Sequence, residues 1–93
     1  MTNQQLIIAK LYVDDSGITR YLKVYKDNDY QNDAVYNVEE FSWPEKRLLR
    51  TITLQNIGAS KWNDIEFGST DASRKYGKFI DENYPIKLHL PLN

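Results

Sequence analysis

The stretch from Leu6 to Lys26 constrains the fold most strongly, because it has the pattern of a β-hairpin. Successive side chains of a strand point to opposite faces of a sheet. Residues 6–13 and 18–26 each place aliphatic side chains at alternate positions, and Asp14-Asp15-Ser16-Gly17 between them is typical of a tight turn. We therefore predict two antiparallel strands joined at this turn.

The two alternations of this hairpin differ in chemistry. One parity is aliphatic apart from Arg20, and we predict that it faces the core: Ile7, Ala9, Leu11, Val13, Ile18, Leu22 and Val24. The other parity is rich in tyrosine and lysine. We predict that it forms one solvent-facing surface, the tyrosine-lysine face, which contains Lys10, Tyr12, Tyr21, Lys23 and Tyr25.

The tyrosine-lysine face has two functional interpretations and two structural ones. Cross-strand tyrosine and lysine pairs stabilise an ordinary solvent-facing sheet. Tyrosine also supplies rigid contact area at protein interfaces, and lysine with tyrosine suits single-stranded nucleic acid, through phosphate contacts and base stacking. Another segment of the same chain could equally cover this face.

Charge is distributed unevenly along the chain, whose net charge is −1. Residues 27–45 carry six acidic side chains and no basic one, whereas the flanking segments are mildly basic. The acidic block is either a solvated loop and strand edge or an acidic docking surface for a basic partner. Its members include Asp27, Asp29, Asp33, Glu39 and Glu40.

The middle of the chain mixes strand and helix signals. Residues 34–40 predict a short edge strand, because both of its faces are mixed. Ser42 and Glu45 have the spacing of a capping box around Pro44, which predicts a helix over 43–49. Residues 50–56 then alternate like a strand, although a helix continuing to Gly58 is the alternative.

The last third of the chain predicts strand, helix and strand. Residues 61–67 form the first, and a helix then begins near Asp71, after Gly68-Ser69-Thr70, and ends before Pro85. Gly77 lies inside that helix, where we expect it to permit close packing against a neighbour. Residues 86–90 alternate as a final strand, with His89 facing solvent.

These elements give the order β-β-β-α-β-β-α-β, which is an α+β fold. We predict one domain, residues 1–93, with a mainly antiparallel sheet and one or two helices packed on one of its faces. A chain of 93 residues has room for one hydrophobic core.

The sequence offers little catalytic or metal-binding chemistry. It has no cysteine, one histidine and four dispersed glycines, which excludes disulfides, common zinc sites and phosphate-binding glycine loops. Residues 27–33 resemble a calcium loop only faintly, because Asn32 replaces its glycine. We predict no enzyme activity, no cofactor and no metal. No apolar run is long enough for a membrane span or a secretion signal, so we predict a cytoplasmic protein.

We predict a non-enzymatic protein-binding module, such as a small inhibitor, an immunity-type protein or an accessory protein of a phage or mobile element. One alternative is a single-stranded nucleic-acid-binding protein that uses the tyrosine-lysine face, although the acidic block opposes this. The other is a homo-oligomeric structural protein, for instance a homodimer. The predicted partner-binding residues are Lys10, Tyr12, Tyr21, Lys23, Tyr25, Asp27, Asp29, Asp33, Glu39 and Glu40.

Overall fold

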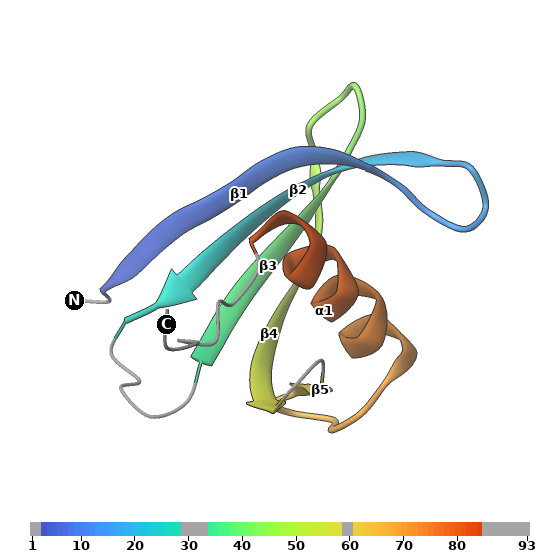
Figure 1. Cartoon of the computed structure of the whole chain (residues 1–93). Helices are drawn as coiled ribbons and strands as arrows, with labels where there is room; N and C mark the ends of the chain where they lie inside the picture. The colour runs from blue at the N-terminus through green and yellow to red at the C-terminus, as the bar shows by residue number, and fades with distance from the viewer. Residues whose placement is uncertain (1–2, 29–33, 59–60, 85–93) are drawn as a thin grey trace, which may run out of the picture.

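The computed structural model describes residues 3–28, 34–58 and 61–84, which form an antiparallel sheet of five strands and one helix (Figure 1). Each strand pairs with the next one in sequence, so the sheet order is β1-β2-β3-β4-β5. The elements are β1 Gln4–Val13, β2 Thr19–Asp27, β3 Ala34–Ser42, β4 Leu48–Gly58, β5 Lys61–Asp64 and α1 Asp71–Asn83. The α+β class is confirmed, but the predicted order of elements is not.

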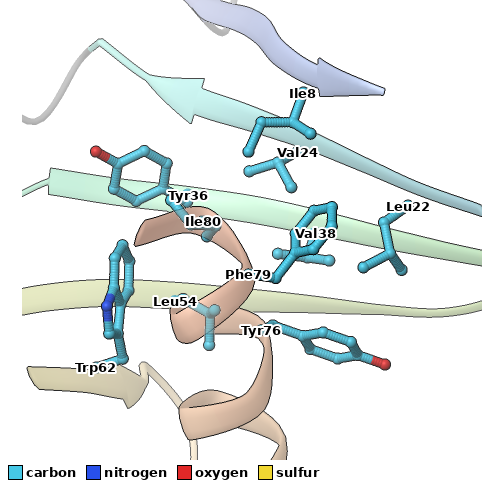
Figure 2. Close-up of a cluster of buried hydrophobic side chains, with 10 residues drawn as sticks. All are labelled: Ile8, Leu22, Val24, Tyr36, Val38, Leu54, Trp62, Tyr76, Phe79 and Ile80. Carbon is cyan, nitrogen blue, oxygen red and sulfur yellow. The ribbon is translucent and has the colours of Figure 1, made fainter. Parts of the chain in front are cut away.

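The hydrophobic core lies between the sheet and α1, which crosses one of its faces (Figure 1). We call this side the helix face. Figure 2 shows that side chains from all five strands meet three side chains of the helix there. The cluster comprises Ile8, Leu22, Val24, Tyr36, Val38, Leu54 and Trp62 from the strands and Tyr76, Phe79 and Ile80 from α1.

Helix α1 begins at a reciprocal cap, since the Thr70 hydroxyl accepts from the Ser73 amide at 3.0 Å and the Ser73 hydroxyl accepts from the Thr70 amide at 2.8 Å. Gly77 faces β5, where a Cβ atom would lie 2.6 Å from the Cβ of Trp62 and would overlap its ring. The predicted helix and the predicted close packing at Gly77 are therefore both confirmed.

The helix predicted over 43–49 is wrong, because this segment is a turn between β3 and β4. The Ser42 hydroxyl accepts a backbone amide, as a helix cap would, but from Arg47 at 3.1 Å. Lys46 has a φ of 63°, which turns the chain back on itself, and the Trp43–Pro44 peptide bond is cis. The strand predicted at 50–56 is confirmed and is longer.

The faces predicted for β2 are confirmed, but those predicted for β1 are wrong, because the hairpin register differs by one residue. Asp14 accepts from the amides of Ser16 and Ile18, both at 2.9 Å, so the connection extends to Ile18 and Val13 pairs with Thr19. A shift of one residue moves every side chain of a strand to the other face. Lys10 and Tyr12 consequently lie on the helix face, while Leu11 lies opposite.

Two smaller corrections concern the remaining strands, and one predicted strand is not tested. The strand at 34–40 is central rather than an edge, since β3 lies between β2 and β4. Its mixed composition arises because one parity contributes Tyr36 and Val38 to the core. The strand predicted at 61–67 ends at Asp64, and the one predicted at 86–90 lies outside the described residues.

Candidate functional site

The side of the sheet that faces away from α1 is its outer face. It carries exposed aliphatic side chains at both flanks, on β1 and on β4: Leu6, Leu11 and Val13 are 48, 45 and 61% exposed, and Leu48 is 51% exposed. The centre is half-buried and aromatic or polar. Pairing places these residues there: Leu6, Ala9, Leu11, Val13, Tyr21, Lys23, Tyr25, Asn37, Glu39, Phe41, Leu48, Thr51 and Thr53.

An aromatic cluster joins the outer face to the turn after β3. The Tyr21 ring lies 6.2 Å from that of Phe41 and 5.7 Å from that of Trp43, between ring centroids. Lysine Nζ atoms lie over two of these rings, Lys23 at 5.4 Å from Phe41 and Lys46 at 5.5 Å from Trp43. These packed rings hold part of the outer face rigid while leaving it partly open to solvent.

The outer face contains four of the predicted site residues: Tyr21, Lys23, Tyr25 and Glu39. Lys23 and Glu39 are direct cross-strand partners, so their charges offset each other. Burial raises the pKa of Tyr25, and the adjacent Glu39 raises it further. The tyrosine-lysine face therefore exists on β2, but its predicted extension to β1 does not.

Lys10 and Tyr12 instead help to attach the hairpin to α1. Lys10 donates to the Asn83 side chain at 2.7 Å. The Tyr12 ring packs edge-on against Phe79, with 5.4 Å between centroids, and more loosely against Tyr76. Tyr12 thus packs against the core on the helix face, and Lys10 adds an exposed hydrogen bond to the end of α1.

The predicted acidic surface does not form as a patch among the described residues. Asp27 and Glu40 are only 9 and 8% exposed, and Glu39 points to the opposite face from Glu40. Asp29 and Asp33 lie outside the described residues. Successive acidic residues in a strand point to opposite faces of the sheet. The acidic block in the sequence therefore does not correspond to one acidic surface among the described residues.

Glu40 is the centre of a polar network on the helix face. Its carboxylate accepts from Arg50 Nε at 2.8 Å and from the Tyr76 hydroxyl at 2.7 Å, and it lies 3.5 Å from Arg20 Nε. Arg50 also donates to the Tyr76 oxygen at 2.8 Å. Burial and the bond to Glu40 raise the pKa of Tyr76. Every member has a partner, so this network stabilises the core and offers no free reactive group.

A groove of about 520 Å³ lies between the tip of the first hairpin and the start of α1. Its walls carry charges of both signs, from Asp15, Arg50, Asp71 and Lys75. Arg50 is already bonded to Glu40, and Lys75 lies over the Tyr12 and Tyr76 rings. The groove therefore lacks a surface of one charge sign that would attract an oppositely charged ligand. Within the described ranges, no three acidic or histidine side chains are grouped to hold a metal.

The residues that sequence reasoning missed are Leu6, Leu11, Val13 and Leu48, all exposed on the outer face. The sequence pattern assigns Leu11 and Val13 to the core, and only the hairpin register places them outside. Leu48 lies within the predicted helix, and Leu6 belongs to the outward set without a predicted contact role. No helix in the described part of the chain is long and apolar enough to cross a membrane. Comparison with protein-family models, curated proteins and solved structures gave no match.

Proposed function

We propose that this protein is a protein-binding module that uses the outer face as its contact surface. The supporting observation is the exposure of Leu11 and Val13 beside the Tyr21–Trp43 aromatic cluster, with Leu6 exposed farther along β1 beside Tyr25. Isolated apolar side chains are normal on surfaces, but contiguous apolar patches mark sites of interaction. Tyrosine and tryptophan flanked by aliphatic residues are also typical of interface centres. The proposal includes the predicted biological roles, namely a small inhibitor, an immunity-type protein or an accessory protein.

The test is a comparison of Leu11→Asp with Ile57→Asp. The two wild-type side chains are similarly exposed, at 45 and 52%, but Ile57 lies at the far end of β4 near β5. We expect the wild type and Ile57→Asp to capture the same protein from the producing cells, and Leu11→Asp to lose it. Purified partner should then bind Leu11→Asp at least about tenfold more weakly, as for a moderate contact residue. Equal binding by all three contradicts the proposal.

A second candidate function is binding of single-stranded nucleic acid, favoured by the aromatic cluster with Lys23 and Lys46. Against it, the rings pack on one another, both ammonium groups lie over rings, and Lys23 faces Glu39. Such binding should weaken steeply with salt. If an oligonucleotide binds at about 50 mM salt and Tyr21→Ala abolishes that binding, this second function replaces the first.

A further inference from the structure

The sheet has an exposed strand edge at the beginning of β4. This strand runs over Leu48–Gly58, yet the short β5 pairs only with its last part, from Leu54 onward. Leu48, Arg50 and Thr51 pair with β3 on one side, and Leu49 is the extra residue where the register shifts between Glu40 and Phe41. All four are exposed. We call Leu48–Thr51 the β4 edge.

The chain turns away from this edge at Asp64. The Asp64 amide and carbonyl both bond to Gly68, at 2.7 Å each, and its carboxylate accepts from the Glu66 and Phe67 amides at 2.7 and 3.0 Å. The last backbone bond towards β4 runs from the Ile65 amide to the Thr53 carbonyl, at 3.0 Å. The Asp64 turn therefore ends β5 and leaves the position beside the β4 edge open.

Backbone alternation then sets the direction of the Thr51 peptide groups. The Thr53 carbonyl points to the β5 side, and in a strand every second residue directs its amide and carbonyl to the same side. The amide and carbonyl of Thr51 therefore point outward from the β4 edge, where β5 has already ended. A strand added there would satisfy both groups.

A groove of about 320 Å³ lies beside this open position. Its walls are Thr51, Ile52 and Thr53 on β4 and Asp64, Ile65, Glu66 and Phe67 of the Asp64 turn. Ile65 and Phe67 are 51 and 71% exposed. An added strand would direct alternate side chains towards this groove. Ile65 and Phe67 favour an apolar residue of the added strand at that point, and the exposed Glu66 between them disfavours an acidic one there.

The charged side chains near the β4 edge indicate which charge the bound segment carries. Lys46 and Arg47 precede β4, and both are exposed. Neither forms an ion pair with any residue in the described part of the chain. Arg50 adds a third cation, already shared with Glu40. Glu45 and Glu66 are also exposed near the edge. An acidic residue of the added strand therefore complements the edge where it lies beside Lys46 and Arg47, and a basic residue there would be repelled.

A second copy of this chain fits the β4 edge poorly. In antiparallel pairing of two copies, a two-fold axis would relate their β4 edges. Ile65 already occupies the position beside Thr53, so this axis must lie at Arg50 or earlier in β4. Such pairing would set the Lys46–Arg50 segments of the two copies against each other. Like charges directly opposite across strands are destabilising.

We propose that the β4 edge binds an extended segment of a partner protein that alternates apolar and acidic residues, as an added strand. This site is separate from the β1 side of the outer face and does not depend on it. It therefore adds a second mode of protein recognition to the molecule.

The test uses two capped synthetic peptides of about eight residues, slightly longer than a typical strand. One alternates glutamate with valine and the other alternates lysine with valine. By fluorescence anisotropy we expect the acidic peptide to bind the full chain at least about tenfold more tightly than the basic one. Amide hydrogen exchange at Thr51 should slow when the acidic peptide binds. Equal binding of both peptides overturns the proposal, and so does no binding at about 1 mM.

Three variants localise the effect. Thr51→Pro removes the outward amide at a position where proline is tolerated in a strand, and we expect about tenfold weaker binding. The double variant Lys46→Glu with Arg47→Glu should bind the basic peptide better than the acidic one. Lys61→Glu, an exposed cation on β5, is the matched control and should leave the preference unchanged.

Two further results separate this proposal from its alternatives. Leu11→Asp should retain peptide binding, so a failure of the outer-face proposal leaves this one standing. If the wild type sediments as a dimer and Thr51→Pro as a monomer, the occupant of the β4 edge is a second copy. That outcome overturns the proposal, as does retained peptide binding in both the Thr51→Pro and the double variants.

Discussion

The two faces of the sheet bury the same kinds of side chain to different extents. On the helix face, Leu22 and Val24 are fully buried under α1. On the outer face, Leu11 and Val13 are roughly half exposed or more. Leu22 and Leu11 lie in adjacent strands of one hairpin. The comparison shows that hydrophobicity alone does not distinguish a core residue from a contact residue, and that pairing register does.

The sharpest test of this comparison pairs Leu22→Ala with Leu11→Ala. We expect Leu22→Ala to lower the free energy of unfolding by about 3 kcal/mol, because it leaves a cavity under the helix. Leu11→Ala should change it by no more than about 0.5 kcal/mol, as for other surface positions. Urea denaturation followed by circular dichroism measures both. Similar losses in the two variants would break the distinction between the faces.

A second test concerns the close packing of α1 against β5. Gly77→Ala would press a Cβ atom against Trp62 and separate α1 from β5. Overpacking costs about 1–3 kcal/mol, and we expect the upper end because the added Cβ would overlap the Trp62 ring. The gain in helix propensity offsets about 1 kcal/mol. We expect a net loss of about 2 kcal/mol in the free energy of unfolding. Arg74→Ala, at an exposed position of the same helix, is the control, and greater stability in Gly77→Ala would contradict the contact.

A third test addresses the polar network on the helix face. Tyr76→Phe removes a hydroxyl that donates to Glu40 and accepts from Arg50. The partners left behind should cost about 1.5 kcal/mol at neutral pH, measured as a shift of the urea midpoint. Arg20, which remains beside Glu40, limits the loss.

The same network predicts how stability depends on alkaline pH. The pKa of Tyr76 is raised from 10.0 in the folded chain, so the folded protein keeps a proton that the unfolded chain releases. Stability from Tyr76 is therefore present below pH 10 and is lost as the pH rises above it. Wild type should lose stability between about pH 9 and 11 more steeply than Tyr76→Phe. Tyr12, Tyr25 and Tyr36, whose pKa values are also raised, should give both proteins a common slope, and the difference between the two proteins reports Tyr76.

The smallest expected effect is at the start of α1. Thr70→Ala removes the hydroxyl that accepts from the Ser73 amide, which should cost about 1 kcal/mol. Thermal unfolding followed by circular dichroism measures the change. Thr70→Ser, which keeps the hydroxyl, should behave like the wild type. A loss of stability as large as that of Leu22→Ala would mean that the helix cap contributes as much to the stability of the helix face as burial does.

Local sequence signals predicted part of this fold. The Asp14–Gly17 turn, the helix from Asp71 and the close packing at Gly77 each depend on residues near one another in sequence or on the special geometry of glycine. They are confirmed because little in the tertiary structure competes with them. The α+β class follows from the same signals.

The remaining errors come from choices that local patterns leave open. Whether Val13 pairs with Ile18 or with Thr19 depends on how Asp14 bonds its turn, and that one residue decided both faces of β1. The Ser42 hydroxyl does bond a nearby amide, but its partner is in a turn and not in a helix. For the candidate site, the β2 tyrosines were predictable on an outer surface, whereas the exposed leucines of β1 were not.

The order of the strands also bears on how the chain reaches this structure. Because each strand pairs with its neighbour in sequence, no crossover has to close before a strand finds its partner. Short-range pairing lowers the entropy cost of forming the sheet and favours rapid folding among β-rich proteins. Folding can thus begin at a single hairpin and extend strand by strand, with α1, last in sequence among these elements, docking onto a sheet already formed.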